Sequence, residues 1–244
     1  MSAIQPSAPP LARPLPRTRS RLALSIAVLV ALLVVIGFAR TFYLRPLYFD
    51  TALPLLAIVH GLVMSAWLLL FVAQAWLVQA HRVKLHRRLG LSSVVMVPLV
   101  VGLGLAMAVH GMRAGHIPVP GITPQQFLAI PFCNIIIFGV LATSGLLARR
   151  RSEVHRRLML LAALVLLSPA VARMPVDAIK LYGPPLIFGV TGLLVLAVVV
   201  RDTVVHRRLH PAFGWGGALA VFGMPMALVL SQTPGWTAFA DLLM

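Results

Sequence analysis

Polar side chains that stand inside long apolar stretches are the residues of this sequence best placed to do chemistry. His60 is followed at steps of seven residues by Trp67, Gln74 and His81. Steps of seven keep residues on one slowly turning face of a helix, so these four side chains form one stripe. Polar and titratable side chains are costly to place in an apolar helix, and we therefore treat the stripe as part of a candidate binding site.

A second polar group surrounds Arg173. Asp177 follows Arg173 at i+4, where the two side chains can pair on one helix face. Residues near the same ends of neighbouring apolar stretches complete a predicted polar cluster, which consists of Arg40, His60, His110, Arg173 and Asp177 above Trp67 and Asn134. One interpretation is a ligand site in which Arg173 contacts an anion and Trp67 forms a wall. The other is that Arg40 and His110 extend to an interface while His60 and Arg173 join helices.

The string HRRL occurs three times, at residues 86–89, 155–158 and 206–209. Each copy lies between two apolar stretches, and basic residues there suit contacts with anionic lipid headgroups, at about 1 kcal/mol per residue near the surface. The predicted headgroup contacts are His86, Arg87, Arg88, His155, Arg156, Arg157, His206, Arg207 and Arg208. The repeat has two interpretations: an ancient duplication of three helix hairpins, or the independent use of basic loops as orientation signals.

Helices must position these residues, because 60% of the 244 residues are hydrophobic and only 11% are charged. Apolar stretches of about 17 residues or more can cross a bilayer as helices. We predict an all-α, polytopic membrane protein with seven transmembrane helices at 22–39, 54–80, 91–112, 127–148, 158–176, 184–200 and 212–231. The Pro- and Arg-rich residues 1–21 predict a disordered tail, residues 22–231 the transmembrane domain, and residues 232–244 a short external tail.

Basic residues alternate with these helices. Sixteen of the 21 Lys and Arg residues lie in the tail and in the segments after the second, fourth and sixth helices; the others are Arg40, Arg45, Arg113, Arg173 and Lys180. Cytoplasmic loops carry an excess of Lys and Arg, which predicts a cytoplasmic N-terminus, an external C-terminus and a location in the inner (plasma) membrane. The net charge of +16 is therefore an orientation signal. We expect the bilayer, with anionic lipids on the cytoplasmic side, as partner, and no nucleic acid.

Several kinds of chemistry are excluded by the residues present. Cys133 is the only cysteine, and five acidic residues are too scattered for a carboxylate-rich metal cage. The phosphate-binding GxxxxGK[ST] loop, the HExxH metal motif and the GxSxG nucleophile motif do not occur. His206 and His210 have i, i+4 spacing, but Arg207 and Arg208 between them favour an interfacial role, and we predict no metal site. The balance favours a protein without enzymatic activity.

Four short segments carry a resemblance to known proteins. LHRRLG at 85–90, HG at 60–61 ahead of Trp67, VHRRLM at 154–159 and RLHPA at 208–212 resemble segments of small, uncharacterised bacterial multipass inner-membrane proteins with HRRLG-type loop motifs. A looser similarity extends to membrane b-type cytochromes and haem-handling assembly proteins, in which paired helix histidines hold a haem. That similarity implies haem b as a cofactor, with His60 and His110 as candidate axial ligands.

Three functions remain open from the sequence. The first is an integral inner-membrane scaffold, assembly or redox-linked component that works with a membrane-protein partner. The second is a haem b-binding membrane redox protein. The third is a transporter or sensor for a small anionic or lipid-like ligand.

Overall fold

The computed structural model describes residues 18–115 and 121–244, and its regular elements are all helical. Residues 1–17 of the predicted tail lie outside the described residues. The helices are α1 (Thr18–Phe38), α2 (Leu55–Gln79), α3 (Val83–Gly90), α4 (Ser93–Arg113), α5 (Pro124–Leu147), α6 (Ser152–Val165), α7 (Ser168–Val171), α8 (Asp177–His206), α9 (Pro211–Ser231) and α10 (Pro234–Asp241). A π-helical turn, η1 (Ala39–Tyr43), and a 3-10 turn, η2 (Arg45–Leu47), follow α1.

Among the described residues, seven helical segments are long and apolar enough to cross a membrane, which confirms the predicted number and agrees with a multi-pass membrane protein. The largest difference in bounds concerns the fifth segment, expected at 158–176 and found at Ser152–Val171. The sixth, expected at 184–200, extends from Leu181 to His206. Both segments therefore include basic residues that the sequence assigned to loops.

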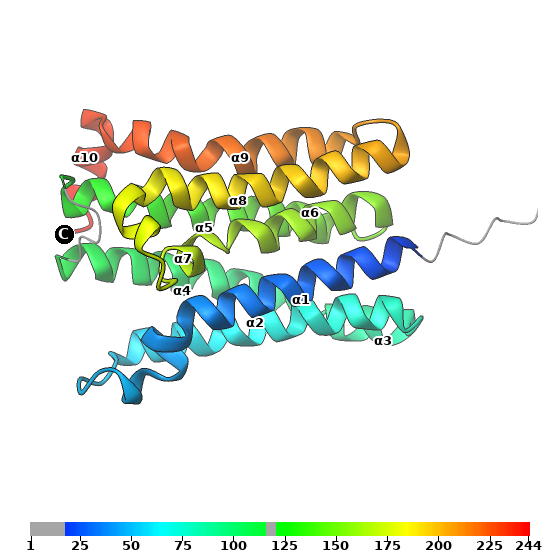
Figure 1. Ribbon diagram of the computed structural model, residues 1–244, viewed down its shortest axis with the longest axis horizontal. Helices are drawn as coiled ribbons and strands as arrows, with labels where there is room; N and C mark the ends of the chain where they lie inside the picture. Colours follow the sequence, from blue (N-terminus) through cyan, green and yellow to red (C-terminus); the bar gives the residue numbers. More distant parts are fainter. Residues whose placement is uncertain (1–17, 116–120) are drawn as a thin grey trace, which may run out of the picture.

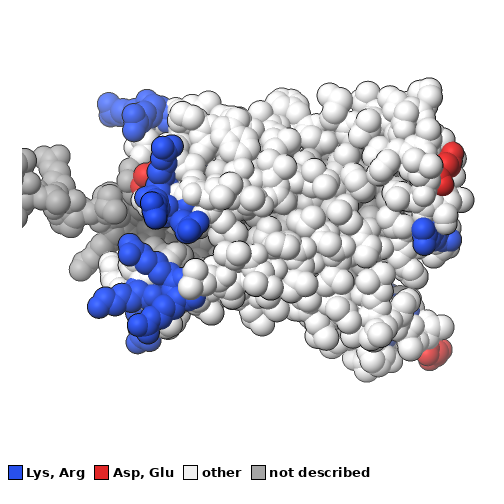
Figure 2. All heavy atoms as spheres, turned by 180° about the vertical axis from the view of Figure 1, so that it is seen from behind, with Lys and Arg blue, Asp and Glu red and all other residues white. Residues whose placement is uncertain are grey.

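The spanning helices run along one long axis and bring the basic segments to the same end (Figure 1). The start of α1, helix α3, the α5–α6 turn and the α8–α9 turn lie at that end, whereas η1, η2 and α10 lie at the opposite end. Figure 2 shows Lys and Arg side chains gathered at the first end, with few at the other. We call the first end the basic end; its residues include Arg87, Arg88, Arg149, Arg156, Arg201 and Arg207.

The fifth span, formed by α6 and α7, lies at the centre of the bundle. In its 18-residue apolar stretch, 72% of the residues are buried, against 11–44% in the other six spans. Its mean hydropathy of 1.6 is nevertheless the lowest of the seven. Helices α5, α8 and α9 pack against α6, and α1 contacts both α6 and α7. A central helix faces protein rather than lipid, so its composition can be less apolar than that of the helices around it.

Asn134 supplies a hydrogen bond that Pro169 removes from this central span. Pro169 has no backbone N–H, so the carbonyl of Val165 loses the donor that an uninterrupted helix would supply at i+4. The buried Asn134 side chain donates its Nδ2–H to that carbonyl oxygen at 3.0 Å, and also lies 3.3 Å from the Met224 sulfur. Asn134 was expected to contact a ligand; its amide is instead committed to joining α5 with α6.

Gly37 permits a second close approach to this span. A Cβ atom at Gly37 would collide with the backbone carbonyl oxygen of Ala170, so α1 and α7 meet backbone to backbone. Small residues allow such contacts between helices in membranes, where van der Waals packing replaces the hydrophobic effect as the force that joins helices.

The three HRRL copies adopt different local structures. The first lies within α3, and the second lies near the start of α6. The third begins at the last residue of α8, where Arg207 has a left-handed backbone with φ of 52°. The copies share the basic end, and the first two are helical while the third leaves the helix at Arg207.

Replacing Asn134 by Ala should lower the free energy of unfolding by about 1 kcal/mol, the scale of interhelical hydrogen bonds in membranes. In a Pro169→Ala background the cost should fall, because residue 169 then offers its own N–H to the Val165 carbonyl. Unfolding of the purified protein in mixed micelles measures both values. Pro225→Ala, in α9, is the control background. An equal cost of Asn134→Ala in all three backgrounds would show that the amide does not compensate for Pro169.

Candidate functional site

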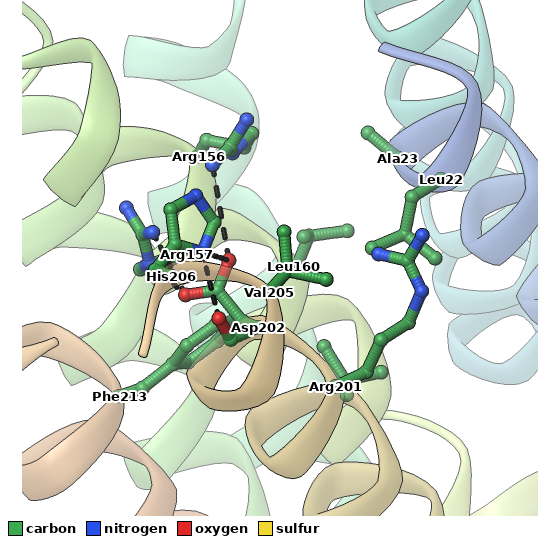
Figure 3. Close-up of a pocket in the computed structure, with 11 residues that line it drawn as sticks. Leu22, Ala23, Arg156, Arg157, Leu160, Arg201, Asp202, Val205, His206 and Phe213 are labelled. Carbon is green, nitrogen blue, oxygen red and sulfur yellow. Dashed lines mark hydrogen bonds and ion pairs between the residues drawn. The ribbon is translucent and has the colours of Figure 1, made fainter. Parts of the chain in front are cut away.

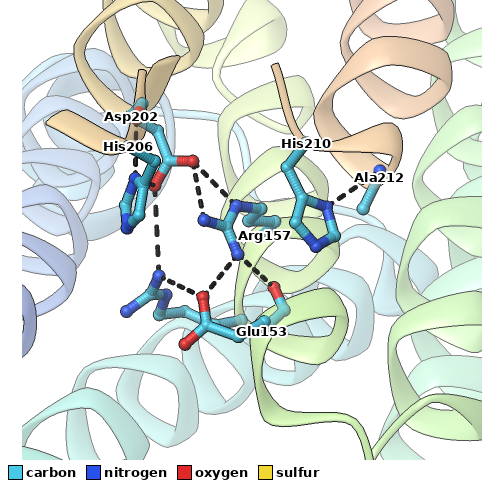
Figure 4. A network of polar contacts seen from close by, with 7 residues as sticks. Glu153, Arg157, Asp202, His206, His210 and Ala212 are labelled. Carbon is cyan, nitrogen blue, oxygen red and sulfur yellow. Dashed lines mark hydrogen bonds and ion pairs between the residues drawn. The ribbon is translucent and has the colours of Figure 1, made fainter. Parts of the chain in front are cut away.

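A network of charged side chains lies at the basic end, where α6, α8 and the start of α9 meet (Figure 4). Its centre is Arg157 of α6, whose side chain is only 2% exposed. The guanidinium donates from Nε to the Asp202 carboxylate at 2.8 Å and lies 2.7 Å from it through Nη2. Its Nη1 donates to the Glu153 carboxylate at 2.6 Å and to the Glu153 carbonyl at 2.9 Å. Hydrogen bonds and opposite charges thus compensate the burial of Arg157.

Asp202 connects this arginine to its own helix. The Nδ1 atom of His206, one turn further along α8, lies 3.3 Å from Oδ1 of Asp202 and donates to the Asp202 carbonyl at 2.7 Å. Arg156 lies 3.9 Å from the same carboxylate oxygen and donates to Glu153 at 3.1 Å. The Arg157 guanidinium also lies 5.6 Å from the ring centre of Phe213, at the start of α9. The network therefore joins three helices.

This network corrects the expected role of Arg157, which was a lipid-headgroup contact. A guanidinium that is almost fully buried and bound to two carboxylates does not reach a headgroup. Arg87, Arg88, Arg207 and Arg208 are exposed at the basic end, as such contacts require, while Arg156 is half-buried. The sequence held a signal for the network: Glu153 and Asp202 are the acidic residues within basic segments, four positions before Arg157 and His206 respectively.

His210 closes the network on the side of α9. Its Nδ1 accepts a hydrogen bond from the backbone N–H of Ala212 at 3.1 Å and so caps the helix. Burial lowers the pKa of His210 below its ordinary value, and the charge of Arg157 lowers it further, so the ring is kept neutral and able to accept. The helix break at Arg207 separates His206 from His210, so the two do not share one helix face despite their spacing.

A cavity of about 230 Å³ opens beside the network, between α1, α6 and α8 (Figure 3). Its polar lining consists of Arg156, Arg157, Arg201, Asp202 and His206. Its apolar lining consists of Leu22, Ala23, Leu160, Val198, Val205 and Phe213. Figure 3 shows Arg201 extending towards Leu22 and Ala23, across the cavity from the other charged groups. The cavity thus combines cationic groups with an apolar wall.

Two side chains that line the cavity are able to bind a ligand. Within the described part of the chain, Arg201 makes no ion pair. The Nε2 atom of His206 is buried and has no hydrogen-bond partner there. Three arginines and two carboxylates leave the cavity and its network with an excess of positive charge even when His206 is neutral. The arrangement is suited to an anion attached to an apolar group.

The predicted polar cluster at the opposite end is only partly assembled. Arg173 and His60 lie within electrostatic range of each other. The Arg173 guanidinium donates to the Pro169 carbonyl at 2.9 Å and stacks on Phe38 at 4.8 Å. Arg40 stacks on Tyr48 at 4.9 Å. These contacts agree with arginines that join neighbouring segments.

The other members of that cluster divide between the core and the surface. Trp67 is buried in the core, edge to face with Phe138 at 5.2 Å, so it forms no wall of an open site. His110 is exposed on α4, and Asp177 is exposed in the first turn of α8. With Asn134 bound to Val165, the structure does not bring the seven residues together around one cavity.

His60 and His110 do not fit a haem held between two buried imidazoles. His110 is exposed on the surface of α4. The Phe42 ring packs directly against Gly61, the residue after His60. Axial ligands must both face the haem from the protein interior, and the exposed His110 does not meet that requirement.

Comparison with protein-family models, curated proteins and solved structures finds no match for this chain. We therefore infer its function from the geometry of its own residues.

Replacing Asp202 by Ala should destabilise the protein by about 3–5 kcal/mol, because it leaves the buried charge of Arg157 without its main partner. A double variant, Arg157→Met with Asp202→Leu, should recover most of this loss, since an apolar pair of similar volume carries no buried charge. Unfolding in mixed micelles measures each change, with the exposed Asp241→Ala as control. A double variant as unstable as Asp202→Ala would contradict the assigned pairing.

Proposed function

We propose that this protein is an inner-membrane receptor or sensor that takes an anionic, lipid-like ligand into the cavity between α1, α6 and α8. The observation that carries the proposal is the cavity's lining, which places Arg201 opposite Arg156 and His206 above an apolar wall. Among the described residues, Arg201 makes no ion pair. Arginine presents a planar fork of donors that suits phosphate oxygens, and it binds them through charge-assisted hydrogen bonds. The apolar wall matches an acyl or other hydrocarbon group.

The proposed ligand belongs to a class that the sequence left open as one of three alternatives, but its site moves to the basic end. At the opposite end, Arg173 is engaged with Pro169 and Phe38, and Trp67 is buried. At the basic end, the charge network holds Arg156, Arg157 and His206 in place before any ligand arrives. Such preorganisation lowers the entropy lost on binding.

We propose further that the basic end faces the cytoplasm, where the inner leaflet supplies anionic lipids. The distribution of Lys and Arg supports this orientation, because sixteen belong to the tail and to segments between helices whose described parts meet at the basic end. The ligand would then enter from the cytoplasmic leaflet at the level of the headgroups.

Fusion of alkaline phosphatase to the C-terminus should give an active enzyme, since that enzyme folds only outside the cytoplasm, and fusion of green fluorescent protein there should stay dark. Fusions after Leu209, in the α8–α9 turn, are the control and should give the opposite result. Fluorescence from the C-terminal fusion would contradict the proposed orientation.

Phosphatidylglycerol should raise the melting temperature of the detergent-purified protein, whereas phosphatidylcholine should not. Arg201→Gln should weaken binding about fivefold to tenfold, because it removes one cationic contact worth about 1 kcal/mol. Native mass spectrometry measures the bound lipid directly. Arg88→Gln, on the exposed surface of α3 at the same end, is the matched control and should weaken binding much less, because a single exposed charge contributes little.

Two results would overturn the proposed receptor. Equal binding of both lipids would show that charge does not select the ligand. An equal loss for Arg201→Gln and Arg88→Gln would show that surface charge, and not the cavity, attracts the lipid. Absence of any lipid effect would favour the scaffold interpretation.

A further inference from the structure

The first turn of α9 is held by one titratable residue, His210. Its Nδ1 accepts a hydrogen bond from the backbone N–H of Ala212 at 3.1 Å, and its carbonyl oxygen accepts from Phe213 at 2.9 Å and from Gly214 at 3.0 Å. The first N–H groups of a helix have no partner within the helix, so a capping side chain supplies one. Histidine is an unusual cap, because Ser, Thr, Asp and Asn are the residues preferred there.

The cap works only while the ring of His210 is neutral. A backbone N–H is always a donor, so the Nδ1 atom that receives it must present a lone pair. A neutral imidazole has one such nitrogen, whereas both nitrogens of a protonated imidazole carry hydrogens. Protonation therefore breaks the hydrogen bond from Ala212 and places two donors against each other.

Charged groups from two helices and a turn act on His210. Arg157 and Glu153 act from α6. Asp202 acts from α8, and Arg208 from the turn before α9. Burial is the largest cause that lowers the pKa of His210, and the charge of Arg157 is the next; the two carboxylates raise it, but both are already bound to Arg157. The partial positive charge at the start of α9 also disfavours a protonated ring.

The pH range of the cap follows from these surroundings. An unperturbed imidazole titrates near pH 6.5, and the folded protein holds the pKa of His210 below its ordinary value. Stabilisation by the cap is therefore complete above about pH 6.5 and is lost as the pH falls through the lower pKa of the folded state. At neutral pH the ring is neutral and α9 is capped.

Phe213 connects the cap to the cavity. It lies in the first turn of α9, three residues after His210, and its ring centre lies 5.6 Å from the guanidinium carbon of Arg157. Its side chain also lines the cavity (Figure 3). Figure 4 shows the hydrogen bond between His210 and Ala212 at the side of the charge network where α9 begins. A change in this turn thus reaches both the network and the cavity.

We propose that His210 is a pH sensor that controls the start of α9. When the pH at the basic end falls, Nδ1 takes a proton from water, the first turn of α9 opens, and Phe213 is released from Arg157 and from the cavity wall. The sensor gives the protein an input other than the lipid. It does not depend on lipid binding, because the release of the cap requires only a proton.

Hydrogen exchange of the full-length protein in detergent tests the sensor. The readout is the protection factor of residues 211–217, which corrects for the intrinsic effect of pH on exchange. Between about pH 7.5 and about pH 5, the wild type should lose about fivefold protection in this segment, which is the effect of removing a typical cap. The thermal midpoint should fall over the same range.

His210→Asn is the deciding variant, because asparagine is a good helix cap and does not titrate in this range. It should keep wild-type protection at neutral pH and lose the acid response of the segment. His210→Ala should lose the protection at both pH values. His81→Asn, which replaces an exposed histidine between α2 and α3, is the control and should respond to acid as the wild type does.

Two results would overturn the sensor. An equal acid response in the wild type and in His210→Asn would show that another group opens the segment. Full protection in His210→Ala at neutral pH would show that the side chain does not cap α9. Neither result bears on the receptor, which the binding of phosphatidylglycerol at neutral pH tests separately.

Discussion

The constraint on which this structure depends is that most of its central span is buried among other helices. Each buried polar group on α6 must find a partner within the protein, because an unsatisfied group in an apolar interior costs several kcal/mol. The Val165 carbonyl is bound by Asn134, the Arg157 guanidinium by Asp202 and Glu153, and the His155 ring by the Gly145 carbonyl. These bonds fix how α5 and α8 lie against α6.

The residues of the basic end divide into two groups because of this constraint. Arginines on the outside of the bundle remain exposed and can interact with water and lipid headgroups, where single charges contribute little to stability. Arg157, turned inward, is tied to two carboxylates and organises three helix ends. The cavity lies where the groups meet, so Arg201 has no ion-pair partner in the part of the chain that the structure describes, while its neighbours are already held. The candidate binding cavity therefore lies at the edge of the charge network around Arg157.

The number of spanning helices was predictable from the sequence, whereas the ends of two helices and the contacts of two buried side chains were not. The number of spanning helices follows from the length and hydropathy of each stretch. The ends of α6 and α8 were misplaced because Arg156, Arg157 and Arg201 look like loop residues until their partners and surroundings are known. The predicted stripe through Trp67 ends before His81, which lies beyond α2 with a left-handed backbone, and the sequence did not reveal that Trp67 meets Phe138. Asn134 likewise signals a polar contact without revealing that Pro169 creates the need for it.

Composition and periodicity by themselves determined that the chain forms seven apolar helices, with most of its basic residues between alternate pairs. These are local properties, since each helix satisfies its own backbone and each loop carries its own charge. Only the tertiary structure decided which of the similar HRRL residues are buried and which residues they contact. Arg157 meets Asp202, and His86 meets His155, through contacts between helices distant in the chain. Such contacts depend on how side chains from several helices fill one interior, and no single segment specifies that.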